Sequence, residues 1–187
     1  MFFDKRISVS MRERKNLQVS LDIKSLDENG RFAGYASVFD VVDSQRDVMI
    51  RGAFFKTLQG RVEQIKLLWQ HMQNEPIGVF ERMFEDERGL YVEGKLLLQV
   101  QRAKEAHTLL KARAVNGLSI GYSPVRYQID DETGIRYLSE VDLWEVSLVT
   151  FPANNSANVT VVKHAFEDEL TYMRSGQLIE LAGALDN

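Results

Sequence analysis

The chain has 187 residues, of which 44% are apolar and 27% charged. This composition supports one folded domain with a real core and argues against global disorder. The formal net charge of −4 disfavours nucleic acid as a partner, because nucleic-acid binders usually carry a basic face. The absence of cysteine excludes disulfides, thiol nucleophiles and thiolate metal sites.

No segment predicts an export signal or a membrane anchor. Residues 1–15 are too charged for a signal peptide. The longest apolar run, 143–153, is interrupted by Glu145 and is too short to span a bilayer. We therefore expect an intracellular protein that has no membrane partner.

Alternation of apolar and polar residues predicts strands at the start of the chain. Residues 17–26 alternate in this way, the Glu-Asn-Gly stretch at 28–30 is typical of a hairpin turn, and residues 31–42 form the return strand. A polar loop is expected at 43–51, followed by a short helix at 52–59.

Further strands are predicted along the middle and last thirds of the chain. We expect one strand at 64–71, two within 79–98, one at 117–129, and one or two within 135–151. Residues 72–78 contain a proline and are predicted to form a loop.

Two segments predict helices. The helix at 99–115 has an apolar stripe and is stopped by the Asn-Gly pair that follows it. The stripe consists of Ala103, Ala106, His107, Leu110 and Ala114. Residues 163–187 predict one or two amphipathic helices.

These elements together predict a mostly β protein with some α structure (α+β), built on an antiparallel sheet or barrel with a few helices. We divide the chain into an N-terminal extension (1–16), a main domain (17–162) and a C-terminal helical tail (163–187).

The three histidines differ in their predicted positions. His164 begins the tail and is expected on the surface, whereas His107 is expected at the edge of the core. His71 ends a strand in phase with the apolar residues of 65–69, so its ring is expected on their side. It also stands where strand becomes loop, a position from which scaffolds present reactive groups. A structural role and a catalytic role are equally open for it.

Glu145 is unusual because it lies within the apolar strand LWEVSLVTF. A buried, unpaired carboxylate costs several kcal/mol, roughly, so such a group finds a partner or changes its protonation state. Four solutions are open: an ion pair with Arg or Lys, backbone donors, an exposed strand end, or a hydrogen bond from a histidine.

The stretch GLSIGY (117–122) alternates a bulky face with a nearly bare one. The bulky side chains are expected to face the core, whereas Gly121 and Ser123 flank Ser119 with little bulk and leave room for a docking group. A serine on a strand is usually inert, because as a nucleophile it needs an adjacent base and a group that orients the base.

A metal site has little support in the sequence. His71 and Glu75 are four residues apart, but Pro76 follows them and the stretch is not helical, so the two side chains would not share a face. We expect neither a metal nor another cofactor.

Seven blocks of sequence occur in an order that is specific to one family. They are GYASVF (34–39), GAFFKTL (52–58), KLLWQH (66–71), PIGV (76–79), RGLYVEGKL (88–96), GLSIGY (117–122) and DLWEVSLVTFPAN (142–154). Over residues 17–162 the chain resembles the tailed-phage prohead proteases of HK97-like phages. That family is regarded as distantly related to the herpesvirus assembly proteases, and the resemblance implies a herpesvirus-protease-like β-barrel core surrounded by helices.

The resemblance also implies an activity and partners. Members of the family cleave the scaffolding portion of the capsid assembly, and themselves, inside the prohead, which permits capsid expansion and DNA packaging. The implied function is a serine endopeptidase without a cofactor, acting in the bacterial host cytoplasm inside the procapsid. The implied partners are the major capsid protein and its scaffolding segment, and formation of a homodimer is left open.

The matched blocks carry the family's site residues onto this sequence. The resemblance implies that Ser119 is the nucleophile, His71 the general base and Glu145 the third member of the triad. Glu140 is a nearby rival for the third role, but it precedes the apolar run and is expected to be solvated.

The oxyanion donors are expected by analogy with the herpesvirus enzymes, in which they follow the third triad member. This analogy places backbone N–H donors at Ala153 and Asn154.

Two positions depart from the family pattern: Arg46 stands where a glycine is common, and Arg51 where a proline is frequent. Residues 163–187 match no block, and they are open as a self-removed tail, a scaffold anchor or a dimer helix. Two other functions stay open, a non-catalytic assembly module of the same fold and a metal-dependent hydrolase.

Overall fold

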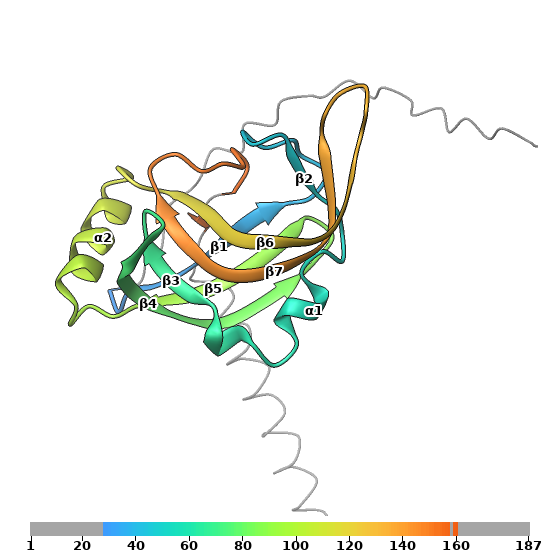
Figure 1. The fold of residues 1–187 in the computed structure, drawn as a ribbon. Helices are drawn as coiled ribbons and strands as arrows, with labels where there is room; N and C mark the ends of the chain where they lie inside the picture. Colours follow the sequence, from blue (N-terminus) through green and yellow to red (C-terminus); the bar gives the residue numbers. More distant parts are fainter. Residues whose placement is uncertain (1–27, 158, 161–187) are drawn as a thin grey trace, which may run out of the picture.

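The computed structural model describes residues 28–157 and 159–160 (Figure 1). The strands are β1 (Arg31–Val38), β2 (Asp47–Met49), β3 (Lys66–Trp69), β4 (Met72–Glu85), β5 (Gly89–Leu96), β6 (Gly117–Ile129), β7 (Arg136–Val149) and β8 (Val159–Thr160). The helices are α1 (Phe55–Leu58), the 3-10 turn η1 (Val62–Gln64) and α2 (Gln101–Lys111).

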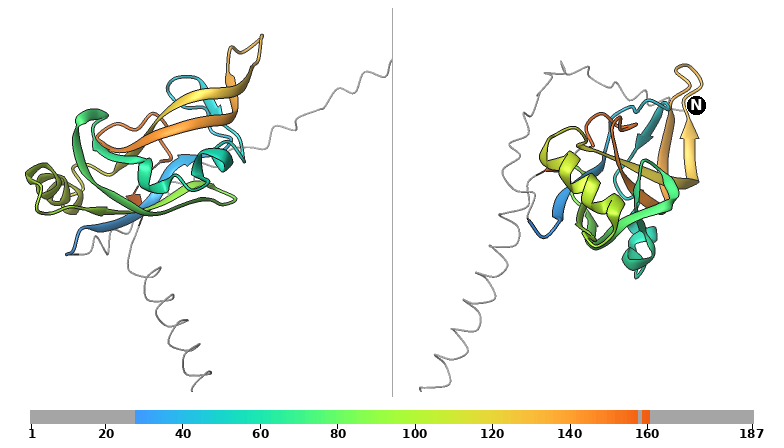
Figure 2. Two further views of the ribbon diagram at one scale, coloured as in Figure 1. Left: turned by 60° about the horizontal axis from the view of Figure 1, so that its bottom comes forward. Right: turned by 90° about the vertical axis from the view of Figure 1, so that its left-hand side faces the viewer.

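The eight strands form one curled sheet in the order β2-β7-β3-β4-β5-β1-β8, with β6 on the other edge of β7. β7 is the central strand, because β6 pairs along nearly all of one edge while β2 and β3 share the other. Both β2 and β3 run parallel to β7, and the remaining pairs are antiparallel. The predicted antiparallel barrel is therefore confirmed only in part, since the sheet is mixed and open (Figure 2).

The two ends of the sheet approach each other at the start of β6. The Leu118 N–H donates to the Ala157 carbonyl (3.1 Å), and the Val159 N–H donates to the Asn116 carbonyl (3.0 Å). Since β8 also pairs with Ala33 and Gly34 of β1, this segment links β6 to the far end of the sheet.

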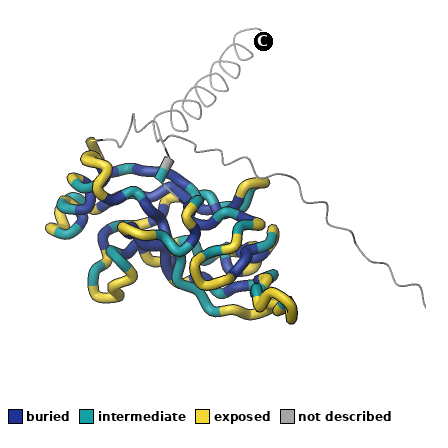
Figure 3. The backbone as a smooth tube through the Cα atoms, turned by 90° about the horizontal axis from the view of Figure 1, so that it is seen from above, coloured by how far each residue is buried: buried dark blue, intermediate teal, exposed yellow. Residues whose placement is uncertain are grey.

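The core lies inside the curl of the sheet, and buried backbone follows the strands while the turns are exposed (Figure 3). Its largest fully buried side chains include Phe32, Phe54, Leu67, Ile77, Leu118 and Leu148. Helix α2 adds four of the five predicted stripe residues, Ala103, Ala106, His107 and Leu110. Ala114 is exposed, because the helix ends at Lys111 rather than at 115. Neither α-helix in the described part of the chain is long and apolar enough to cross a membrane.

The strand predicted at 117–129 is confirmed with the same bounds, and the segment 135–151 forms the single strand β7. The loop predicted at 72–78 is wrong, because β4 starts at Met72 and continues through Pro76. The register of β3 and β4 shifts on both sides of the Leu68–Pro76 pair, and proline is tolerated in a sheet at such irregularities.

The predicted loop at 43–51 contains the short strand β2. Residues 28–29 form a turn, followed by Gly30 with φ 84°, where the sequence predicts the hairpin turn. The predicted first strand, 17–26, lies outside the described residues, as do the extension 1–16 and the tail 163–187. At Ala33 and Gly34, β1 pairs with β5 on one edge and with β8 on the other.

The central strand supplies the first test of the fold. Leu138 of β7 is fully buried between β2 and β6, so Leu138→Ala is expected to lower the free energy of unfolding by about 2–5 kcal/mol. Urea unfolding followed by circular dichroism measures this. Val125→Ala, on an exposed part of β6, serves as the control and is expected to stay within about 0.5 kcal/mol of wild type. Equal effects of the two substitutions would contradict the assigned core.

Candidate active site

His71 lies in a two-residue hairpin loop between β3 and β4. Trp69 and Met72 pair across the loop, and both Gln70 (φ 52°) and His71 (φ 61°) have positive φ, as the type I′ turn requires. The prediction that His71 continues the strand alternation is therefore wrong, because β3 ends at Trp69. Non-glycine residues in such a conformation carry about 1–3 kcal/mol of strain each, so the turn needs support from its surroundings.

That support comes from the end of β7. The Gln70 N–H donates to the Leu148 carbonyl (3.0 Å), and the Gln70 side chain donates to Thr150 Oγ1 (2.9 Å). The Thr150 N–H donates back to Gln70 Oε1 (3.3 Å). The His71 N–H donates to Ser147 Oγ (3.0 Å). These four bonds hold both strained residues in place.

The His71 ring is joined to Glu145 by a short hydrogen bond between Nδ1 and Oε1 (2.6 Å). Of the four ways in which Glu145 could be accommodated, the structure shows the hydrogen bond with a histidine. The carboxylate is nearly buried, and its other oxygen, Oε2, accepts a hydrogen bond from Ser147 Oγ (2.7 Å). The hydrogen bond to Glu145 raises the pKa of His71 above its ordinary value, and partial burial of the ring opposes this. With Nδ1 engaged, Nε2 is left for a second partner.

The place of Gly121 depends on Glu145. The two residues are direct partners across β6 and β7, and a Cβ on Gly121 would lie 2.3 Å from Glu145 Oε1. The bare flank of GLSIGY therefore makes room for the carboxylate of Glu145, and that it also admits a docking group stays a prediction.

Ser119 lies on the same face of β6 as Gly121, opposite Ser147 of β7. Ser119 and His71 line one open cleft of about 520 Å³, to which Gly121 and Ala153 also contribute. The bulky side of GLSIGY faces the core as predicted, with Leu118 fully buried. Residues from β6, the β3–β4 turn and β7 thus meet at one site because β6 and β3 are both neighbours of β7.

The turn after β7 also lies beside Ser119. Ala153 and Asn154 line a small cavity of about 20 Å³ with it. Ala153 is tethered through its carbonyl, which accepts from the Ser44 N–H (3.0 Å), and the Asn154 side chain donates to the Val38 carbonyl (3.0 Å). Within residues 28–157, the N–H groups of Ala153 and Asn154 have no acceptor. Two unused donors are thus held next to the serine.

Glu140 is not part of this constellation. It pairs with Lys56 (2.8 Å) and with Arg126 (3.6 Å). The hydrogen bond from Lys56 lowers the pKa of Glu140. The prediction that Glu145, rather than Glu140, is the partner of His71 agrees with this geometry.

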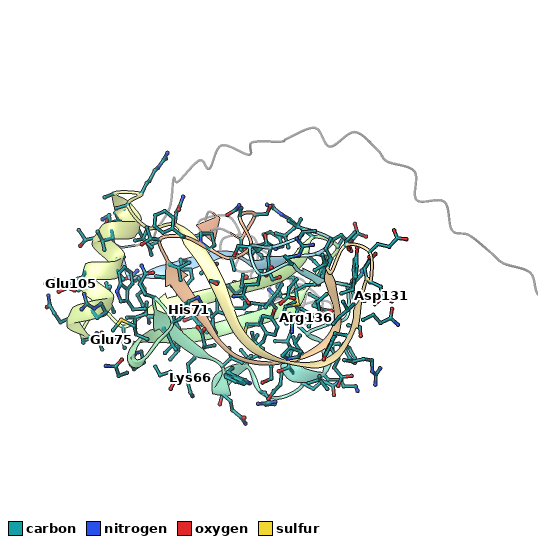
Figure 4. All side chains as sticks on the ribbon, turned by 45° about the horizontal axis from the view of Figure 1, so that its top comes forward. Lys66, His71, Glu75, Glu105, Asp131 and Arg136 are labelled. Atoms are coloured by element: carbon teal, nitrogen blue, oxygen red, sulfur yellow. The ribbon has the colours of Figure 1, made fainter. Side chains whose placement is uncertain are left out.

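Two supporting groups were missed in the sequence. The first is Ser147, which bridges Glu145 and the His71 backbone, and its only signal is a serine two residues after the buried glutamate. The second is buried Asp47, which accepts from Arg136 Nε (2.7 Å) and from the Tyr122 hydroxyl (2.5 Å). Burial and Asp47 raise the pKa of Tyr122. Figure 4 labels His71 beside the β3–β4 hairpin and Arg136 at the start of β7.

The loop that precedes β2 shows why the family commonly has a glycine where this chain has Arg46. Arg46, where a glycine is common, has φ 64°, a backbone conformation that glycine adopts without strain. Asp43 Oδ1 closes the loop by accepting from the N–H groups of Gln45 and Asp47 (both 2.8 Å). Burial raises the pKa of Asp43.

A serine near a histidine that is hydrogen-bonded to a carboxylate is the arrangement of triad hydrolases. Residues 19–171 match the family described as "Caudovirus prohead serine protease", and the chain belongs to this family.

Two relatives and one solved structure extend this finding. The chain is 35% identical over 141 residues to the prohead protease of Enterobacteria phage HK97, covering 73% of this chain and 61% of that protein. It is 37% identical over 153 residues to the capsid polyprotein of Pseudomonas phage PAJU2, covering 77% of this chain and 22% of that protein. The chain thus spans less than two thirds of either relative. The bacteriophage T4 capsid assembly protease shares the fold, with a TM-score of 0.52 and 11% identity over 64% of this chain and 81% of that one.

The contact between His71 and Glu145 predicts a pH effect. Because the pKa of folded His71 is raised, the pair stabilises the fold fully below the ordinary histidine pKa of about 6.5, and this contribution is lost as pH rises through the raised value. Glu145→Gln is expected to lower the His71 pKa, as measured by NMR titration of the ring. Glu140→Gln, also on β7, is the control and should leave the His71 pKa unchanged. An unchanged pKa in Glu145→Gln would show that Glu145 is not its source.

The bridging role of Ser147 gives a second prediction. Ser147→Ala leaves Glu145 Oε2 and the His71 N–H without their partner, so the free energy of unfolding is expected to fall by about 1–3 kcal/mol. Ser139→Ala removes a partly exposed hydroxyl from the same strand and is expected to change it by less than about 0.5 kcal/mol. Chemical unfolding compares the two variants, and equal stabilities would contradict the bridge.

Proposed function

We propose that the chain is a serine endopeptidase of phage capsid maturation. The observation that carries this proposal is the 2.6 Å hydrogen bond between His71 Nδ1 and Glu145 Oε1 in the cleft that Ser119 lines. Ser119 is the nucleophile, His71 the general base, and Glu145 the group that orients and stabilises the imidazolium.

Acylation begins when His71 Nε2 takes the proton of the Ser119 hydroxyl. Oγ then bonds to the carbonyl carbon of the scissile peptide, and the carbonyl electron pair moves onto its oxygen. The imidazolium returns the proton to the leaving nitrogen as the C–N bond breaks, which leaves an acyl group on Ser119. Water, deprotonated by His71, then releases the new carboxyl end and restores the serine. Since the raised pKa of His71 favours the imidazolium that Glu145 stabilises, this pair suits the base to its task.

The attack on the scissile carbonyl forms a tetrahedral intermediate, and its negatively charged oxygen needs preorganised hydrogen-bond donors. The N–H groups of Ala153 and Asn154 are assigned this role, because they have no acceptor among residues 28–157 and their turn lines a cavity with Ser119. The tether from Ser44 to the Ala153 carbonyl holds the turn in place.

The substrate assigned to the site is the scaffolding segment of the major capsid protein, together with the protease itself. One relative is a prohead protease, and another is a capsid polyprotein of which this chain matches only 22%. Cleavage inside the procapsid, in the cytoplasm of the bacterial host, follows from this assignment. A homodimer remains a prediction.

The decisive experiment is co-expression with the capsid protein, followed by intact-mass measurement of both products. Wild type is expected to yield trimmed capsid subunits, whereas Ser119→Ala is expected to lose at least about 10⁴-fold in cleavage rate. Ser123→Ala, on the same strand, is the matched control and should process normally.

Trimmed subunits in the Ser119→Ala sample would remove the serine from the mechanism. Uncut subunits with both wild type and Ser119→Ala would favour a non-catalytic assembly module. Loss of cleavage with a chelator, but not with an acylating reagent directed at serine, would favour a metal-dependent hydrolase.

A further inference from the structure

Phe151 is the most exposed large apolar side chain among the described residues, at 90% of its surface. It lies two residues after the end of β7 and lines the same cleft as His71 and Ser119. Single exposed apolar residues are ordinary on protein surfaces and need no explanation. Phe151 differs from such residues because it stands at the mouth of the candidate active site.

The backbone on both sides of Phe151 is firmly held. Before it, Thr150 exchanges two hydrogen bonds with the Gln70 side chain, 2.9 and 3.3 Å long. After it, Pro152 packs so tightly on β6 that a Cβ on Gly117 would lie 2.7 Å from Pro152 Cδ. The backbone therefore presents the ring from a fixed position. Because this backbone is already ordered, binding a group over the ring costs the protein little backbone entropy.

The cleft that Phe151 borders is mostly polar, with Ser44, Gln45 and Arg136 in its lining, and it has a smaller apolar part. Ile120, Tyr122 and Pro124 line the cleft with Phe151, and Ile120 and Tyr122 pack against the core. An exposed aromatic ring that adjoins an apolar strip within a polar cleft can hold one apolar side chain, while the polar groups face the backbone of the bound chain.

We propose that Phe151 is a substrate-binding residue that packs against an apolar side chain of the polypeptide held across Ser119. This inference rests on the proposed function and names the class of side chain that the site selects. Phe151 lies between Thr150, which is bonded to the residue before the general base, and Ala153, in the assigned oxyanion turn. The selected side chain therefore lies close to the scissile bond, within about two residues of it.

The test uses the full chain and a peptide spanning the cleavage site that mass analysis identifies. Phe151→Ala is expected to raise KM about 10- to 100-fold, the worth of covering one phenyl ring, while kcat changes by less than about 3-fold. Phe151→Leu restores an apolar side chain and is expected to recover most of the affinity. Phe55→Ala is the matched control, because Phe55 is also exposed (64%) but lies on α1 and does not line the cleft.

A second peptide substrate tests whether Phe151 itself contacts the apolar side chain of the substrate. In a peptide whose apolar residue nearest the scissile bond is replaced by serine, wild type should lose affinity by the same factor, and Phe151→Ala should lose no more. Independent losses from the two changes would overturn the contact.

Three other outcomes also overturn the inference. They are an unchanged KM in Phe151→Ala, an equal effect of Phe55→Ala, and a change in sedimentation mass without a change in KM, which would make Phe151 a contact between copies of the chain. If wild type cleaves no peptide bond in the capsid protein or in itself, the proposed function fails and the inference fails with it.

Discussion

The site depends on one requirement, that a carboxylate placed inside an apolar strand be fully paired. Glu145 is nearly buried on β7, and an unpaired charge there would cost several kcal/mol, roughly. Its two oxygens are satisfied by His71 and Ser147. Gly121 is opposite because a side chain at that position would collide with the carboxylate. The positions of four residues from three segments therefore follow from the burial of one charge.

The same requirement gives a reason for the strained turn at Gln70 and His71. A hairpin with glycine at this point would relax the backbone but would supply no imidazole. Positive φ at both residues is stabilised by the end of β7, through Leu148, Ser147 and Thr150. Strain that is held by its surroundings is typical of functional positions. Because the bonds that hold the turn come from the strand that carries Glu145 and from Thr150 just after it, His71 and Glu145 share one rigid support.

The strands with clear periodicity were predictable, and the site only in part. β6 has the predicted bounds because its alternation is uninterrupted, and α2 has the predicted stripe apart from Ala114. The first part of β4, residues 72–78, was predicted as a loop. A proline that is tolerated at a register shift in a sheet gives the same local signal as a proline in a loop. Local pattern singled out Ser119, His71 and Glu145, but their roles in one site came from family resemblance, because spacing along a chain does not specify which strands become neighbours.

The sequence by itself determined that Glu145 needs a partner, that Ser119 lies on a sparse strand face, and which family the blocks resemble. These follow from local composition and period, which act over a few residues. Only the tertiary structure decided that the partner is His71, that Gly121 makes room for the carboxylate, and that Ser147 and Asp47 support the site. It also decided that the sheet is mixed and open. The physical reason is that β7 pairs with β2, β3 and β6 at once, and such long-range pairing depends on packing that no local pattern encodes.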